Sequence, residues 1–343
     1  MPTLITLDEM RSAQQRIAGV AVRTGLHRVE PDRLQAAGVA ELPFALYIKA
    51  ESEQPIGSFK LRGAYNRIAQ LSPEQLKRGV ITYSSGNHAQ GVAYSARALG
   101  SKAVIVMPDN APAVKIEATR ALGAEVVFVG PASSARKAKA EELAAAHGYT
   151  IIPPYDDPAI IAGQATCGLE IVEQLGVAEN GAGVVVLSPV SGGGLLSGIS
   201  TAVKLAGGPG VQVWGAEPEL AADAKESFYS KTLVEWPASN TSRTICDGLR
   251  TQSVGVLNFE HILRYVDGIV TVSEDEVRAA MRIVLAATGL VAEPSGAATL
   301  AAALFHHGEL PQCKRMVAVL SGGNIEPELK QQLEAGMANT ASA

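Results

Sequence analysis

Lys60 is the residue of this chain best placed for covalent chemistry, because it lies in the run Gly57-Ser58-Phe59-Lys60. Apolar residues recur at helical spacing from Leu61 onward, and Ser58 is a common N-cap residue, so we expect a helix with Lys60 in its first turn. The positive end of the helix dipole favours the neutral amine, which can attack a carbonyl group and form a Schiff base. The alternative is an ordinary solvated lysine. Three further loops favour the chemical interpretation.

A glycine-rich loop follows the apolar stretch at 183–187 and leads into a helical pattern. Glycines allow backbone N–H groups to approach an anion, and the helix N-terminus adds its dipole. The alternative, a flexible turn, is less favourable because successive glycines lose much conformational entropy on folding. Neither G-x-x-x-x-G-K-[ST] nor G-x-G-x-x-G is present, so this is not a nucleotide loop of either kind. We predict that the loop binds a phosphate through Ser191, Gly192, Gly193 and Gly194.

A polar loop, Ser84-Ser85-Gly86-Asn87-His88, joins the apolar stretch at 79–83 to another helical pattern. Its hydroxyls, amide and imidazole at a helix N-terminus are suited to binding a carboxylate. Two alternatives remain. One of the two serines could be an ordinary helix cap, and His88 could be a buried histidine with satisfied hydrogen bonds. We expect no direct proton transfer by His88. The third loop, Ser321-Gly322-Gly323-Asn324, follows the apolar stretch at 317–320 and is a weak signal alone.

Two carboxylates flank a backbone carbonyl after the apolar stretch at 211–216. Glu217, Ala221 and Asp223 together offer the oxygen ligands that Mg²⁺ or Ca²⁺ prefers. The alternative, two solvated acids in a loop, is about as well supported by the sequence.

The elements that position these loops alternate regularly between strand and helix. This alternation predicts an α/β fold with doubly wound parallel sheets. Ligands bind at the carboxyl ends of such strands, so the loops should share one rim. Pro153–Pro158 interrupts the alternation, and we predict two domains: a large one formed by 1–75 and 160–343, and a small one formed by 76–159. The expected strands are 45–49, 79–83, 103–107, 125–129, 183–187, 211–216 and 317–320, and the main helices are 88–99, 114–122, 135–146, 163–175 and 273–287.

Composition excludes several classes of protein. The net charge is -5 without a basic block, which argues against nucleic-acid binding. Met1–Ile17 is too charged for a signal peptide or a membrane span. The three cysteines are far apart, which argues against a disulfide framework and fits a reducing compartment. We therefore expect a cytoplasmic protein whose partner is a small molecule rather than a membrane.

Taken together, these motifs resemble the threonine/serine dehydratase and serine racemase family of pyridoxal-phosphate enzymes, fold type II. The resemblance implies that Lys60 carries the cofactor, that Phe59 packs on its ring and that Asn87 bonds the ring hydroxyl. It also implies that 191–194 binds the phosphate and that Ser321 faces the pyridine nitrogen. The motifs are G-S-F-K-L-R-G-A at 57–64, S-S-G-N-H-A-Q-G-V-A at 84–93, P-P-Y-D-D-P at 153–158, A-E-P-S-G-A at 292–297 and S-G-G-N at 321–324.

The resemblance also implies an activity. A hydroxyl beside the pyridine nitrogen does not keep it protonated as a carboxylate would, which favours β-elimination. The expected reaction is dehydration and deamination of an L-3-hydroxy amino acid to a 2-oxo acid and ammonia, with Lys60 taking the Cα proton. Members of the family usually form dimers, so we expect a homodimer. The rivals are a serine racemase, with Ser85 as the group on the second cofactor face, and a non-catalytic amino-acid sensor on the same fold.

The substrate side chain is the open question. The resemblance implies that Ser84, Ser85, Asn87 and His88 bind substrate, and racemase-like members carry an arginine where Arg136 lies. That arginine could pair with a second substrate carboxylate, as in 3-hydroxyaspartate. The alternative is a solvated Arg136, and departures such as Cys167 could instead admit a bulky group, as in phenylserine. Threonine or serine remains the first expectation because the long motifs match it best.

Overall fold

The structure is a computed structural model that describes residues 3–130, 133–177 and 183–340. Its described strands form a six-stranded sheet in the order β1-β2-β10-β7-β8-β9 and a four-stranded sheet in the order β5-β4-β3-β6. Neighbouring strands run parallel, except that β1 is antiparallel to β2 at one edge. The prediction of an α/β protein with two doubly wound parallel sheets is therefore confirmed.

The strands are short and mostly buried. Their bounds are β1 (Leu26–Arg28), β2 (Ala45–Ala50), β3 (Val80–Thr82), β4 (Ala103–Pro108), β5 (Glu125–Val129), β6 (Thr150–Ile151), β7 (Val184–Pro189), β8 (Gln212–Pro218), β9 (Gly268–Val272) and β10 (Arg315–Leu320).

The helices connect the strands and cover both sheets. Their bounds are α1 (Leu7–Ile17), α2 (Pro31–Ala36), α3 (Lys60–Ile68), α4 (Pro73–Arg78), α5 (Asn87–Ala98), α6 (Ala113–Ala121), α7 (Ser133–His147), α8 (Pro158–Leu175), α9 (Gly194–Ala206), α10 (Asp223–Ser230), α11 (Ala238–Thr241), α12 (Val256–Tyr265), α13 (Glu274–Thr288), α14 (Pro294–Phe305) and α15 (Pro327–Thr340), with 3-10 turns η1 (Glu51–Glu53), η2 (Glu219–Ala221) and η3 (Asp247–Leu249).

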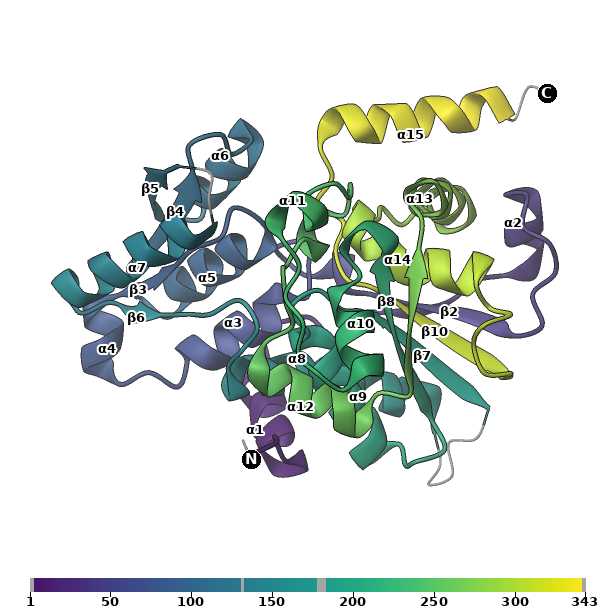
Figure 1. Ribbon diagram of the computed structural model, residues 1–343, viewed down its shortest axis with the longest axis horizontal. Coiled ribbons are helices and arrows are strands. Elements are labelled where there is room, and N and C mark those ends of the chain that lie inside the picture. The colour runs from purple at the N-terminus through teal and green to yellow at the C-terminus, as the bar shows by residue number, and fades with distance from the viewer. Residues whose placement is uncertain (1–2, 131–132, 178–182, 341–343) are drawn as a thin grey trace.

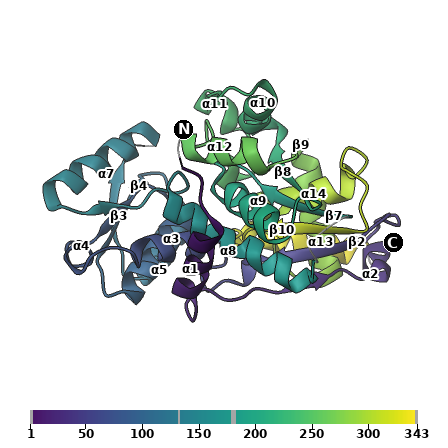
Figure 2. The ribbon, with the colours of Figure 1, turned by 90° about the horizontal axis from the view of Figure 1, so that it is seen from below.

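The six-stranded sheet is buried on both faces. Along β10, Met316 and Leu320 pack into a cluster with α13 and α14, whereas Val317 and Val319 pack into a cluster with α8, α9 and α12. Successive side chains of a strand point to opposite faces, so a continuous apolar run is what a doubly covered strand requires. α9 and α12 lie beside each other in both views (Figures 1 and 2).

The four-stranded sheet is covered in the same way and lies at the left of Figure 1. Ile105 of β4 packs with Val92 of α5 on one face, and Val104 packs with Ala140 of α7 on the other. All four strands lie between Val80 and Ile151. This agrees with a small domain at 76–159, whose boundaries stay a prediction.

Two local predictions need correction. Ser58 does not cap α3, because it forms an antiparallel bridge with Gly322, and the N-cap is Phe59 without a side-chain hydrogen bond. α8 begins at Pro158 rather than Gly163, because the Asp157 carboxylate accepts hydrogen bonds from the N–H groups of its first turn. The sequence patterns also missed β9, α12 and α14.

Candidate active site

Lys60 is the first residue of α3 and is half-buried. Its Nζ donates to the Pro154 carbonyl oxygen at 2.8 Å and lies 5.1 Å from the centroid of the Phe59 ring. Burial lowers the pKa of the Lys60 amine to about 8, although the nearby Glu293 carboxyl opposes that shift. The sequence also predicts a lowered pKa for Lys60, but the main cause is burial rather than the helix dipole. A substantial fraction of this amine is neutral near pH 8.

The lysine loop is joined to the loop after β10 by backbone hydrogen bonds. The Phe59 N–H donates to the Ser321 carbonyl at 3.1 Å, and the Gly323 N–H donates to the Gly57 carbonyl at 2.9 Å. Ser321 is buried and lies directly after β10. The pairing therefore brings Ser321 beside the residues that precede Lys60, as the shared rim of a parallel sheet predicts.

The glycine turn between β7 and α9 has a defined shape. Ser191 and Gly193 have left-handed backbones, with φ of 56° and 91°. The Gly193 N–H donates to the Val190 carbonyl at 3.1 Å, which closes the turn. The N–H groups at the start of α9 have no partner within the helix, so they are available to an anion. These features fit the phosphate of the expected cofactor.

Tyr155 links the glycine turn to the lysine. A Cβ atom on Gly192 would lie 2.4 Å from the Tyr155 ring, so only glycine fits there. The residue before it, Pro154, accepts the hydrogen bond from Lys60. Adjacent residues thus contact the amine and the turn, and one ligand can span both.

In the serine loop between β3 and α5, neither serine hydroxyl caps the helix. The N-cap of α5 is Gly86, and its N–H donates to Ser84 Oγ at 3.3 Å. Ser85 is half-buried in the same loop. The interpretation of either serine as an ordinary cap is therefore wrong, and the hydroxyls remain at the N-terminus of α5.

Asn87 connects this loop to the large sheet. Its Nδ2 donates to Glu293 Oε1 at 2.7 Å, and its Oδ1 accepts from Asn324 Nδ2 at 2.8 Å. Glu293 is a site residue that our assignment missed. Its position inside the A-E-P-S-G-A motif was a usable signal, because an acid in an apolar run needs a partner. Burial and the nearby Asp247 raise the pKa of Glu293 to about 8.

His88 is buried, and its Nε2–H donates to the Ile152 carbonyl at 3.0 Å. Burial, reinforced by the Lys60 charge, lowers the pKa of its imidazole to about 3. The ring is therefore neutral and ties α5 to the segment after β6. This agrees with our expectation that His88 does not transfer protons.

Arg136 lies in the first turn of α7 and is half-buried. It is one turn before Ala140, which packs against the four-stranded sheet, so both residues share a face of the helix. α7 follows β5, and its N-terminal end therefore lies at the rim where the strands end. Burial lowers the pKa of its guanidinium.

Glu217, near the end of β8, and Asp223, the first residue of α10, are both buried. Glu217 Oε1 accepts the Lys225 N–H at 2.6 Å, and burial together with Asp223 raises its pKa far above its usual range. Burial raises the pKa of Asp223 to about 7, and its Oδ2 makes no hydrogen bond with any described residue. The described residues contain no cluster of three or more acidic, histidine or cysteine side chains around a metal position.

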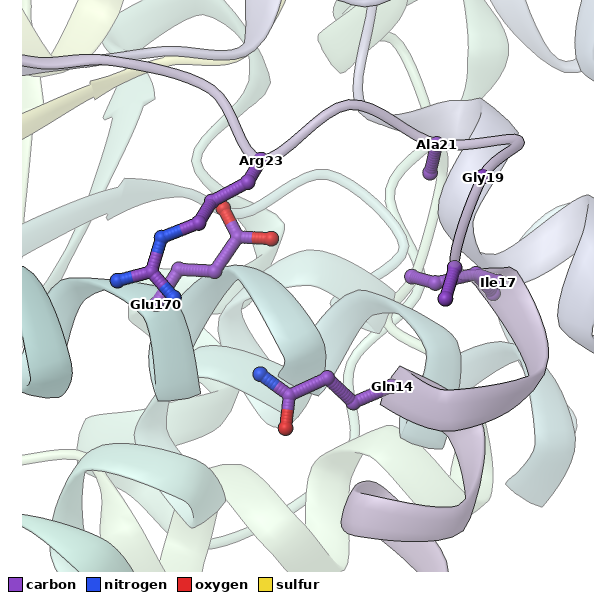
Figure 3. A pocket seen from close by; sticks show the side chains of 7 residues that line it. Gln14, Ile17, Gly19, Ala21, Arg23 and Glu170 are labelled. Atoms are coloured by element: carbon purple, nitrogen blue, oxygen red, sulfur yellow. The ribbon is translucent and has the colours of Figure 1, made fainter.

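A cavity of about 300 Å³ lies elsewhere, between α1, the connector after it and α8 (Figure 3). Its wall includes Glu170, which pairs with Arg62 and Lys49 in a buried network. Cys167 is close enough to Arg62 and Glu51 of this network for their charges to affect its thiol. Cys167 itself is fully buried among core residues of α8 and α9, and its effect on the size of the substrate pocket stays a prediction.

The comparisons with known proteins agree with this geometry. A family model described as "Pyridoxal-phosphate dependent enzyme" matches residues 27–322. The chain is 40% identical to the L-threo-3-hydroxyaspartate ammonia-lyase of Saccharomyces cerevisiae and 38% identical to the catabolic L-threonine dehydratase of Escherichia coli, in each case over 94% of both chains. The crystal structure of serine racemase from Dictyostelium discoideum has a TM-score of 0.83 at 36% identity and covers 94% of this chain and 99% of its own. None of the described helices is long and apolar enough to span a bilayer.

Proposed function

The chain belongs to the family of pyridoxal-phosphate-dependent enzymes, and we propose that it is a dehydratase of L-3-hydroxy amino acids. The products are a 2-oxo acid and ammonia. The observation that carries this proposal is the contact of adjacent residues, Pro154 and Tyr155, with the Lys60 amine and the Gly192 turn. One phosphorylated aldehyde can occupy both positions.

Bound pyridoxal phosphate supplies a ring that withdraws electrons and makes the Cα proton of an amino acid acidic. The residues of the chain hold and direct this chemistry. Lys60 would hold the aldehyde carbon of the cofactor, and once the amino group of the substrate has replaced it there, its freed neutral amine would take the Cα proton. Ser84, Ser85, Asn87 and His88 hold the substrate carboxylate at the start of α5. Phe59, Asn87 and Ser321 orient the ring, and 191–194 binds the phosphate.

The first substrate candidates are L-threonine and L-serine. A dicarboxylate, L-3-hydroxyaspartate, is the second candidate because Arg136 lies at the rim where a second carboxylate would project. The similarity to a hydroxyaspartate ammonia-lyase supports the same candidate.

A substrate panel tests the proposal. The holoenzyme is mixed with each amino acid, and oxo acid, ammonia and the D-enantiomer are measured. We expect oxo acid and ammonia in equal amounts from at least one 3-hydroxy amino acid. If only the D-enantiomer forms, or if nothing reacts, the dehydratase proposal is wrong.

The variant Arg136→Ala then tests which substrate Arg136 recognises, by comparing kcat/KM for each amino acid. The variant loses the charge-assisted pair between Arg136 and the second substrate carboxylate. The fall in kcat/KM for 3-hydroxyaspartate should correspond to about 2–5 kcal/mol of lost transition-state binding, and kcat/KM for threonine should not change. The matched control is Lys137→Ala, because Lys137 is the exposed neighbour on the same helix. Equal small losses on every substrate would mean that Arg136 does not contact the side chain.

We further propose that Mg²⁺ or Ca²⁺ binds Glu217, Asp223 and the Ala221 carbonyl. The buried Oδ2 of Asp223 supports a cation there, because a buried carboxylate oxygen needs a partner. Excess EDTA should lower the Tm of the parent, and added Mg²⁺ or Ca²⁺ should restore it. Asp223→Asn should remove this response. An unchanged Tm of the parent in EDTA would exclude the site.

A further inference from the structure

Asn258 holds the glycine turn from the side of α12. It is fully buried, and its Nδ2 donates to the Gly192 carbonyl oxygen at 2.8 Å. The Gly255 N–H donates to the same oxygen at 3.1 Å. Two donors therefore fix one carbonyl in the turn that we assign to the phosphate.

This carbonyl determines which way the turn presents its donors. A trans peptide places the C=O and the following N–H on opposite sides, so fixing Gly192 O also fixes the direction of the Gly193 N–H. That N–H donates to the Val190 carbonyl. Without such restraints, adjacent glycines sample many conformations, including some that turn a carbonyl oxygen toward the anion.

The turn is also enclosed from two sides. A Cβ atom on Gly193 would lie 2.9 Å from Asn258 Cβ, and one on Gly192 would meet the Tyr155 ring. Asn258 thus restricts the turn by packing as well as by hydrogen bonding, and Tyr155 restricts it by packing.

Asp156 fixes α12 to the same segment. Its carboxylate accepts the N–H groups of Val256 at 3.1 Å, Leu257 at 2.9 Å and Asn258 at 3.4 Å, which are the first residues of the helix. Pro154 and Tyr155, which contact Lys60 and the turn, directly precede Asp156. The position of Asn258 is therefore set by the segment that also contacts the amine.

We propose that Asn258 is a positioning residue for the cofactor phosphate: it keeps the Gly192 carbonyl turned away so that the N–H groups at the start of α9 face the anion. This inference rests on the proposed function. It predicts an effect on the phosphate and none on the aldehyde end of the cofactor.

The test compares two aldehydes on the full-length chain. Cofactor-free protein is titrated with pyridoxal phosphate and with pyridoxal, which lacks the phosphate. In Asn258→Leu, affinity for pyridoxal phosphate should fall about tenfold, as expected for the loss of one of the two hydrogen bonds that hold the buried Gly192 carbonyl. Affinity for pyridoxal should stay within about twofold, because the change spares the aldehyde end.

Asn66→Leu is the matched control. Asn66 is also a buried asparagine on a helix, and its Nδ2 also donates to a backbone carbonyl, that of Ala159 at 2.6 Å. This variant should lose stability but keep the ratio of the two affinities. Asn258→Asp is the second variant: it keeps the shape but replaces the donor, and it should show the same selective loss if the leucine variant does not fold.

Two outcomes overturn the inference. One is an unchanged affinity for pyridoxal phosphate in both Asn258 variants. The other is an equal loss for both aldehydes, which would mean that Asn258 only supports the fold. Failure of the parent to bind pyridoxal phosphate at all would instead contradict the proposed function.

Discussion

At the scale of single residues, Lys60 and Glu293 form the central pair. Glu293 is buried and Lys60 is half-buried, and both have a pKa moved to about 8. The carboxylate of Glu293 stabilises the ammonium form of Lys60 and so opposes the effect of burial. The fraction of Lys60 that can attack an aldehyde is therefore controlled by a residue on α14's N-cap.

The rate at which cofactor-free protein captures pyridoxal phosphate should follow this titration. It should rise with pH, level off above about 8 and be absent in Lys60→Ala. Glu293→Gln removes the carboxylate, so the midpoint should move to lower pH. Stopped-flow absorbance measures the rate, and a midpoint that moves to higher pH would contradict the assignment.

We predict that Ser85 is needed for racemisation and matters less for dehydration. Racemisation needs a second acid–base group on the cofactor face opposite Lys60, whereas dehydration needs only one base at Cα. Ser85→Ala should therefore abolish any formation of D-serine and lower oxo acid formation less. A chiral assay of serine and an assay of oxo acid, run on the same variant, measure the two reactions. Undiminished racemisation would show that Ser85 is not the second acid–base group.

At the scale of elements, His306 joins the end of α14 to the start of α13. Its Nε2 lies 3.0 Å from Glu276 Oε2, and its Nδ1 lies 2.7 Å from Glu309 Oε1. Glu276 also completes the capping box of α13 by accepting the Ser273 N–H. Burial alone would lower the pKa of His306, but the two carboxylates raise it above 6.5.

This raised pKa gives a pH dependence with a definite sign. The charged histidine stabilises the folded state fully below pH 6.5, its unfolded value, and the contribution is lost as pH rises through the higher folded value. His306→Gln should flatten the Tm profile over that window and leave Tm above it nearly unchanged. A variant whose profile still matches the parent would exclude His306 as the source.

At the scale of the whole molecule, one buried ionic network connects distant segments. Arg62 bonds Glu51 at 2.7 Å and Glu170 at 2.7 Å, and Lys49 bonds Glu170 at 2.6 Å. Lys49, Glu51 and Arg62 come from the consecutive elements β2, η1 and α3, whereas Glu170 comes from α8, 108 residues after Arg62. Although burial alone would raise it, Arg62 lowers the pKa of Glu51 to about 2.

Removing Arg62 alone should destabilise the fold more than removing Arg62 and the charge of Glu51 together. Arg62→Met leaves the buried Glu51 carboxylate without its ionic partner and Glu170 with Lys49 alone, and it should lower the free energy of unfolding by about 3–5 kcal/mol. Adding Glu51→Gln should recover part of that loss, because one unpaired charge disappears. Urea unfolding of the single and double variants measures this, and strictly additive losses would show that the two residues are not coupled.

Much of the order of strands and helices, though not β9, α12 or α14, could be predicted from the sequence, as could the loops that we assign to the site. Hydrophobic periodicity, N-caps and glycines act over a few residues, so β5 was placed at 125–129 and the Ser273 capping box at the start of α13. The parallel sheet then follows from the alternation, and with it the shared rim. Lys60 and 191–194 belong to this local information. The homodimer and the cytoplasmic location stay predictions.

Only the tertiary structure decided which residues support that site. Glu293 lies 206 positions from Asn87, and Asn258 lies 66 positions from Gly192. Nothing local to either residue indicates its partner, because these contacts depend on how whole helices pack on the sheets. The pKa values of Lys60 and Glu293 arise for the same reason, since burial and neighbouring charge exist only after the chain has folded.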